Sequence, residues 1–184
     1  MTPPSPSLAL RAPVFRDGVL AFNAPKAFLF TFTPHGTRLH GDARGSVDKF
    51  HNEYGGEFVA PDERFEAMRC DDLAEDPLLI SPAMRGVIED TIEQHCDFRE
   101  WHLFAYNVRT NHVHVVVSAS GDPDRMLTDL KAYLTRVLRK ATAIGDRKRV
   151  WAEGGSKRHL YTDDAVRRAC EYVYLAQGPD LPRE

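Results

Sequence analysis

Two histidines separated by a single residue are the side chains in this sequence best suited to chemistry. They lie in the run Asn111-His112-Val113-His114, which continues as an apolar stretch to Val117. Side chains alternate along a β-strand, so the two histidines would project from one face while the valines project from the other. Two imidazoles that reach one point are a common pair of ligands for a divalent metal. The alternative interpretation is a pair of half-buried histidines with hydrogen-bonded rings.

Two tyrosines near the C-terminus form the second group of candidate residues. Tyr172 and Tyr174 lie in a segment whose pattern predicts a helix. A tyrosine on a helix beside a sheet is most often a core residue with a bonded hydroxyl. The two side chains are about 200° apart around a helix, so they cannot both face one site. We expect Tyr174 on the buried stripe with Val166 and Cys170, and Tyr172 on the accessible side.

Basic residues are concentrated in one part of the chain. The segment from Arg125 to Arg168 contains twelve Lys and Arg residues against five acids, although the net charge of the whole chain is −3. A basic segment of this kind is what the neutralisation of phosphates requires. A solvated helix face followed by a loop is the alternative explanation.

Hydrophobic periodicity predicts the elements that would position these residues. Ser81 is placed to cap the first helix, and Asp122-Pro123 opens the second. The predicted order is strand Ala27–Thr33, helix 81–96, strands Trp101–Val108 and His112–Ser118 as a hairpin, helix 122–143, strand Lys157–Tyr161 and helix 162–177. This β-α-β-β-α-β-α order predicts an α+β fold with a ferredoxin-like antiparallel sheet that carries helices on one side.

The length of 184 residues predicts one domain. Residues 1–24 contain several prolines and predict a flexible N-terminal tail, so that residues 25–184 form the domain. Residues 37–77 are interrupted by glycines and prolines and predict an insertion. We expect no membrane partner and a cytoplasmic location, because no apolar run approaches about 20 residues and no signal-peptide pattern opens the chain. Three widely spaced cysteines predict neither a disulfide framework nor a thiolate zinc site.

These features together resemble the HUH single-tyrosine nucleases, meaning the IS200/IS605-like transposases and their REP-associated relatives. The Asn111-His112-Val113-His114 run matches the metal-binding strand of that family. Tyr172-Val173 resembles the start of the segment that carries the nucleophile in the REP-associated branch. The resemblance spans residues 27 to 178 approximately and implies an HUH transposase-like domain.

The resemblance implies an enzyme of DNA transposition that nicks and rejoins single-stranded DNA. Tyr172, or alternatively Tyr174, would attack a phosphodiester and leave a 5′-phosphotyrosine and a free 3′-hydroxyl. A phenol is a weak nucleophile, but its phosphoester has a good leaving group, so the same site can reverse the reaction.

The resemblance also implies a divalent metal, Mg²⁺ or Mn²⁺, held by His112 and His114. Two nitrogen ligands suit Mn²⁺ better than Mg²⁺. Related enzymes place a third polar ligand four residues after the nucleophile, where this sequence has Ala176. Gln177, one position further, is the weak candidate for that ligand.

The expected partner is single-stranded or hairpin DNA, bound by a monomer or a homodimer that associates with the nucleoid. Trp151 is a candidate stacking platform for a base, with core packing as the alternative. The candidate contacts to the DNA backbone are Lys131, Arg136, Arg139, Lys140, Arg147, Lys148, Arg149, Lys157 and Arg158.

Two other functions are compatible with the sequence. The first is a non-catalytic DNA-hairpin binding protein that keeps the fold. The second is a small metal-dependent hydrolase that uses His112, His114 and His102. A covalent tyrosine-linked DNA adduct would separate the nuclease from the binding protein, because only the nuclease can form one.

Overall fold

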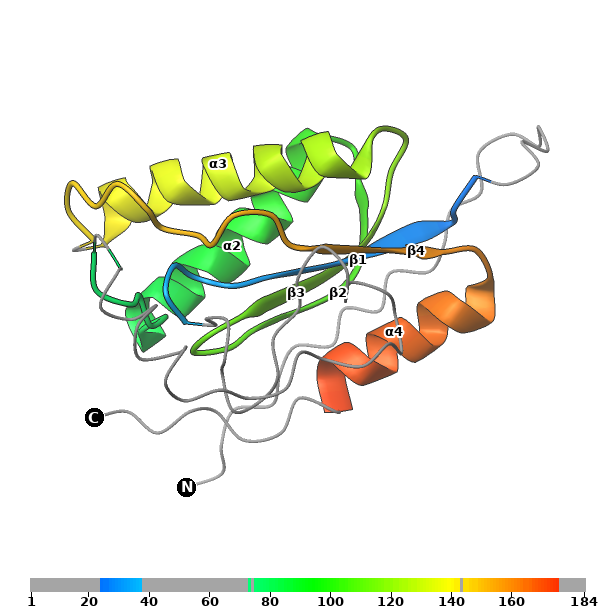
Figure 1. Cartoon of the computed structure of the whole chain (residues 1–184). Coiled ribbons are helices and arrows are strands. Elements are labelled where there is room, and N and C mark those ends of the chain that lie inside the picture. Colours follow the sequence, from blue (N-terminus) through cyan, green and yellow to red (C-terminus); the bar gives the residue numbers. More distant parts are fainter. Residues whose placement is uncertain (1–23, 38–72, 74, 143, 176–184) are drawn as a thin grey trace, which may run out of the picture.

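The computed structural model describes residues 24–37, 73, 75–142 and 144–175. All the predicted elements are present in the predicted order (Figure 1). They are β1 (Ala27–Phe32), α2 (Pro82–Phe98), β2 (His102–Val108), β3 (Val113–Ser118), α3 (Pro123–Ala141), β4 (Ser156–Leu160) and α4 (Asp163–Leu175). Gln177, nearly all of the predicted tail and most of the segment 37–77 lie outside the described residues.

The four strands form one antiparallel sheet in the order β2-β3-β1-β4. This order confirms the ferredoxin-like α+β prediction. The side chains of β1 alternate, so that Phe28, Phe30 and Phe32 enter one hydrophobic cluster while Ala27 and Leu29 enter another. Strand β1 is therefore buried on both faces, which explains its nearly continuous apolar sequence.

The helices cover both faces of the sheet, as Figure 1 shows. Helices α2 and α3 pack together over one face through residues such as Ile88, Ile92 and Leu134. Helix α4 packs on the opposite face through Val166 and Val173. The prediction of helices on one side is therefore correct for α2 and α3 and wrong for α4, because β1 and β3 carry apolar residues on their second face that a helix must cover.

Local sequence signals fix the ends of the two longer helices. The Ser81 hydroxyl accepts the Met84 N–H at the start of α2, and the Asp122 carboxylate accepts the Asp124 N–H at the start of α3. In both helices a proline occupies the first position, where its missing N–H costs no helical hydrogen bond. These caps fix where α2 and α3 begin relative to the sheet.

The stretch that follows β1 and the stretch that precedes α2 lie in contact with each other. Gly36 has a φ of 75°, and a Cβ on it would lie 2.9 Å from the Cα of Pro77. The Leu78 N–H donates to the His35 carbonyl at 2.8 Å, and the Thr37 hydroxyl donates to the Asn111 carbonyl at 3.2 Å. The two ends of the segment 37–77 therefore lie side by side, next to the turn that precedes β3.

Two further expectations concern membrane helices and cysteines. Within the described part of the chain, no helix combines the length and the apolar character needed to cross a membrane. Cys96 and Cys170 are free thiols. Burial raises the pKa of Cys96 to about 12 and also raises the pKa of Cys170. A raised pKa leaves less of each thiol as the reactive thiolate.

Candidate functional site

A row of polar side chains crosses the sheet on the face that α4 covers. Strand register places Asn107 of β2, His114 of β3, Thr31 of β1 and Ser156 of β4 opposite one another in turn. The neighbouring row on the same face contains the apolar residues Val116 and Leu29. The polar row therefore marks the place where the hydrophobic contact between α4 and the sheet ends.

The two histidines lie together at this row, as their spacing predicts. The ring centroids of His112 and His114 are 4.7 Å apart, and the planes are nearly perpendicular at 71°. His112 immediately precedes β3, and its Nδ1 lies 2.8 Å from the side-chain oxygen of Asn111. An amide oxygen only accepts, so this contact is a hydrogen bond in the neutral tautomer that carries the proton on Nδ1 and the lone pair on Nε2.

His114 is held more firmly than His112. Its side chain is buried at 4% exposure, and its Nδ1 lies 2.7 Å from the Thr31 hydroxyl on the adjacent strand. A hydrogen bond to one ring nitrogen fixes the orientation of the imidazole and directs the other nitrogen. Thr31 is therefore the residue that orients His114.

The tyrosine predicted to be the nucleophile lies against the histidine pair. The ring centroids of Tyr172 and His114 are 5.5 Å apart, in an edge-on arrangement. The exposures of Tyr172 and Tyr174 are 45% and 43%, so accessibility does not separate the two. Burial, together with the neighbouring Cys170, raises the pKa of Tyr174, which makes its hydroxyl harder to ionise. The contact with His114 is what favours Tyr172.

The buried side of α4 is shifted by one residue from the expected one in the last turns of the helix. Its buried residues are Val166, Ala169 and Val173, so Val173 is the inward residue of the last turn. The two tyrosines flank Val173 and are both half-exposed. The expectation that Tyr174 lies on the buried stripe and Tyr172 on the accessible side is therefore wrong, because the two are equally exposed.

The histidine pair fits a divalent metal as a two-nitrogen platform. His112 and His114 would hold the ion, and the predicted third candidate, Gln177, lies outside the described residues. Across the part of the chain that the structure describes, no group of three or more His, Cys, Asp or Glu side chains gathers into a metal site.

His102 does not complete that platform. It pairs with Ser118 at the far end of β3 and packs its ring on Phe104 at 4.5 Å between centroids. Four residues along a strand separate Ser118 from His114, a distance of about 13 Å. His102 is therefore too far away to be a third ligand beside His112 and His114, and the hydrolase alternative keeps only those two histidines.

Several of the predicted DNA contacts make hydrogen bonds or ion pairs within the protein. The Lys131 ammonium donates to the carbonyls of Ala152 and Gly154 at 2.7 Å each, and burial lowers its pKa. Lys157 pairs with Asp124 at 2.5 Å. These two lysines hold the segment before β4, and β4 itself, against α3, and their contact with DNA stays a prediction.

Trp151 and Arg139 are also engaged by their neighbours. The Trp151 indole N–H donates to the Lys131 carbonyl and to the Thr135 hydroxyl, both at 3.1 Å, and its ring packs edge-on against Phe32. The Arg139 guanidinium donates to the Arg147 carbonyl at 2.9 Å. For Trp151 these contacts are those of the core-packing alternative rather than of a stacking platform.

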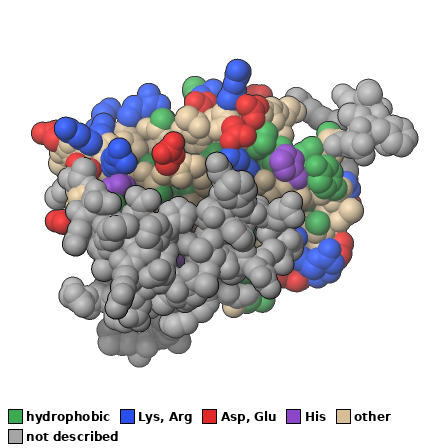
Figure 2. All heavy atoms as spheres, viewed as in Figure 1, with side chains coloured by type: hydrophobic (Ala, Val, Ile, Leu, Met, Phe, Trp, Pro, Cys, Tyr) green, Lys and Arg blue, Asp and Glu red, His purple; other side chains and the backbone are tan. Residues whose placement is uncertain are grey.

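The remaining basic residues fall into two groups. Figure 2 shows Lys and Arg side chains over α3, with acidic side chains among them. Arg136 belongs to this group and lies over the Tyr133 ring at 5.4 Å. Helix α3 packs on the sheet face opposite α4, so this group is separated from Tyr172 by the sheet.

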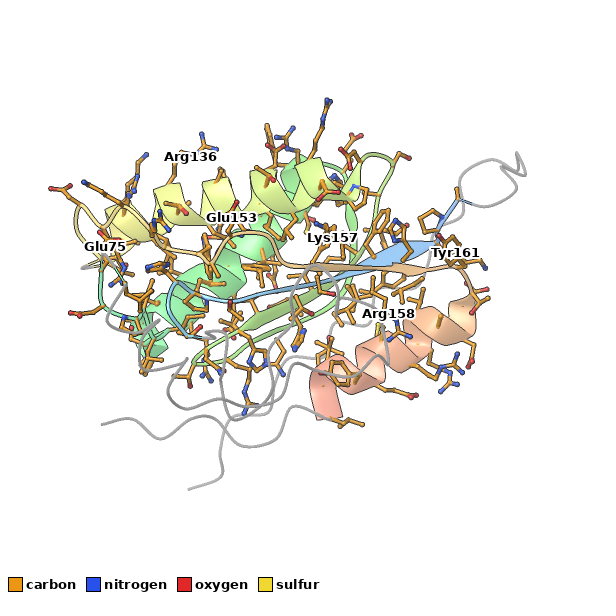
Figure 3. The ribbon with its side chains drawn as sticks, viewed as in Figure 1. Glu75, Arg136, Glu153, Lys157, Arg158 and Tyr161 are labelled. Atoms are coloured by element: carbon orange, nitrogen blue, oxygen red, sulfur yellow. The ribbon has the colours of Figure 1, made fainter. Side chains whose placement is uncertain are left out.

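The second basic group lies on the side of the histidines. Arg158 pairs in register with Leu29, which places it on the α4 face, whereas Lys157 points toward α3 (Figure 3). The loop 147–149 leads into Val150 and Trp151, which bond to the stretch after β1 at the end of the sheet where His112 lies. Arg158 and this loop therefore lie on the face, or at the end, of the sheet where the histidines are found.

Sequence reasoning missed Thr31 and Asn107. Thr31 is the one polar residue in the apolar run of β1, and its alternation with Phe30 and Phe32 is a signal that could have found it. Asn107 donates from its side-chain amide to the Val173 carbonyl of α4 at 2.7 Å. Nothing local to β2 indicates that contact, because it depends on where α4 lies.

Comparison with known proteins identifies the family. The family model described as transposase, IS200-like, matches residues 76–168, just over half of the chain. The chain belongs to the IS200-like transposase family. The match includes His112 and His114 and ends before Tyr172.

Two solved structures are similar to the chain at low identity. One is a REP-associated tyrosine transposase bound to a REP hairpin, with 11% identity, a TM-score of 0.43 and coverage of 88% of this chain and 72% of that one. The other is a Deinococcus radiodurans R1 protein assigned as a transposase, with 12% identity, a TM-score of 0.42 and coverage of 86% and 95%. The comparison with curated proteins found no match. Both likenesses are too weak to bear on the site.

Proposed function

We propose that this IS200-like transposase cuts and rejoins single-stranded DNA through a covalent link to Tyr172. The observation that supports the proposal is the placement of the Tyr172 ring 5.5 Å from that of His114, which itself lies 4.7 Å from that of His112. The tyrosine and the histidines come from elements far apart in the sequence, so the fold is what brings them together.

The proposed reaction is a transesterification at a scissile phosphate. The Tyr172 oxygen attacks phosphorus, the bond from phosphorus to the 3′ oxygen breaks, and the phenolic proton is lost as the 3′ oxygen gains one. The products are a 5′-phosphotyrosine and a free 3′-hydroxyl. Attack by a 3′-hydroxyl on the phosphotyrosine reverses these changes and rejoins a strand.

His112 and His114 are the proposed ligands of a divalent metal, Mn²⁺ or Mg²⁺. When bound, the metal would polarise the phosphate and stabilise the extra negative charge of the transition state. Thr31 holds His114 in a fixed orientation, and Asn111 sets the tautomer of His112 so that Nε2 is the ligating nitrogen. The position of Gln177 as a further ligand stays a prediction.

Arg158 and the loop 147–149 are the proposed contacts to the DNA backbone. They lie on the face or at the end of the sheet where the histidines are found. A single strand or the strand beside a hairpin could then run past Tyr172 with its phosphates near positive charge. The runner-up function is a DNA-hairpin binding protein of the same fold without catalysis.

Covalent trapping tests the proposal. The full chain is incubated with labelled, hairpin-bearing single strands and Mn²⁺, and the products are separated on a denaturing gel. We expect a labelled protein band that disappears on chelation of the metal and is absent in His112→Ala, whose half-exposed ring can be removed without opening the core. DNA binding without that band in the wild-type chain would favour the runner-up.

A further inference from the structure

Asn107 joins the helix that carries the tyrosines to the strand beside the histidines. Its side-chain amide donates to the main-chain carbonyl of Val173 at 2.7 Å. On β2 it lies directly opposite His114 of β3, so both side chains occupy the same row beneath α4. One hydrogen bond therefore ties the backbone next to Tyr172 to the strand pair that holds His114.

The bonded carbonyl belongs to the last described turn of α4. The structure describes α4 as far as Leu175, two residues beyond Val173. The Asn107 amide supplies this carbonyl with a donor from the sheet. The Val173 side chain is fully buried against the sheet, so this residue is fixed both by packing and by its backbone.

Because Val173 is fixed, the backbone position of the neighbouring Tyr172 is fixed as well. The Tyr172 side chain is half-exposed and has fewer packing restraints than Val173. The position of its Cα relative to His114 is then set by the last turn of α4. Rates of attack on a bound phosphate are sensitive to misplacement of the nucleophile by about 1 Å.

We propose that Asn107 is a positioning residue for Tyr172. The inference rests on the proposed function, since it assigns Asn107 a role in the same transesterification. Asn107 contacts neither the DNA nor the metal in this role and acts through the backbone of α4. Its replacement should therefore slow the chemical step and leave binding unchanged.

The test compares three variants of β2. Asn107→Asp keeps the shape but cannot donate when ionised, and Asn107→Gln keeps the amide donor on a longer arm. Tyr106→Phe is the matched control, because the adjacent Tyr106 hydroxyl bonds to Glu93 of α2 on the other face of the sheet at 2.6 Å. All three remove or alter one hydrogen bond between β2 and a helix.

The measurements are the single-turnover rate of adduct formation at saturating DNA and the dissociation constants for DNA and Mn²⁺. For Asn107→Asp we expect the rate to fall about tenfold or more while both constants stay within about twofold. Asn107→Gln should recover part of the rate, and Tyr106→Phe should match the wild type. A wild-type rate in Asn107→Asp, or an equal loss of rate in Tyr106→Phe, would overturn the proposal.

Hydrogen exchange at the amides of residues 172–175 separates this inference from the proposed function. We expect faster exchange there in Asn107→Asp than in Tyr106→Phe, whether or not the wild-type chain forms an adduct. Unchanged exchange rates at these amides in Asn107→Asp would show that Asn107 does not anchor α4. A wild-type chain without adduct but with faster exchange in Asn107→Asp would instead refute the nuclease reaction and leave the anchoring of α4 in place.

Discussion

At the scale of single residues, the site depends on neighbours that orient its reactive groups. His114 is buried and bonded to Thr31, whereas His112 is half-exposed and bonded to the adjacent Asn111. The hydrogen bond from Thr31 crosses between strands, so it holds His114 relative to the sheet. Partners of this kind change metal affinity about 10- to 100-fold in proteins that bind metal through histidine.

Replacement of Thr31 by Val should weaken Mn²⁺ binding about tenfold, because the isosteric side chain lacks the hydroxyl that orients His114. Thr31→Ser should recover most of the affinity. Titration with Mn²⁺ followed by electron paramagnetic resonance measures the effect without DNA. Thr91→Val is the control, because it removes a buried hydroxyl bonded to Val87 within α2, on the opposite face. Equal affinities for Thr31→Val and the wild type would remove Thr31 from the site.

At the scale of elements, the interface of α2 and α3 contains a buried histidine. His95 is 3% exposed and packs against Trp101 and Tyr133 at 5.2 and 5.0 Å between ring centroids. Neither of its ring nitrogens has a hydrogen-bond partner among the described residues. Burial lowers the pKa of His95, Arg99 and Arg136 lower it further, and Asp129 opposes them.

The lowered pKa of His95 predicts a decrease of stability in mild acid. The unfolded chain binds the proton near pH 6.5, and the folded chain binds it only at lower pH. The free energy of unfolding should therefore be highest above pH 6.5 and fall as the pH drops from there through the pKa of the folded state. His95→Phe keeps an aromatic ring and removes the titration, so its unfolding curve should lose this pH dependence.

Urea unfolding at pH 7.5 and 5.0 measures the effect. The variant should also gain about 1 kcal/mol at pH 7.5, because it removes two buried polar atoms that lack partners. If His95→Phe and the wild type lose the same stability between the two pH values, other groups account for the acid sensitivity.

The elements were predictable from the sequence, but the positions of several side chains were not. Period-2 and period-3.6 patterns predicted each strand and helix of the described residues, and Ser81 and Asp122 marked two helix starts. An apolar pattern on both sides of β1 indicates that both faces are covered, but it does not say which helix covers which face. Asn107 was missed for the same reason, since its partner Val173 belongs to α4.

At the scale of the whole molecule, charge is divided between two faces. On the α3 side, Lys131, Arg136 and Lys157 interact with a carbonyl, a ring and an acid of the protein. Arg158 lies on the histidine face, and the loop 147–149 leads to the end of the sheet where His112 lies. The basic segment of the sequence is therefore two structural groups, and its net positive charge alone does not locate the DNA.

Neutralising Arg147, Lys148 and Arg149 together should weaken DNA binding and flatten its salt dependence. For each phosphate that the variant no longer neutralises, the slope of log affinity against log salt should decrease in magnitude by about 0.7 on single strands. The control removes the same charge from Arg125, Arg167 and Arg168, which are exposed and paired with acids on α3 and α4. Equal changes of slope in the two variants would mean that the loop makes no specific contact with DNA.

Measuring covalent adduct formation by the variants Tyr172→Phe and Tyr174→Phe tests the central claim most directly. Both changes remove one oxygen from a half-exposed ring, so each serves as the control for the other. With hairpin-bearing single strands and Mn²⁺, Tyr172→Phe should form no adduct at unchanged thermal stability, and Tyr174→Phe should keep most of it. An adduct in Tyr172→Phe with none in Tyr174→Phe would move the nucleophile to Tyr174, and an adduct in both would contradict the tyrosine mechanism.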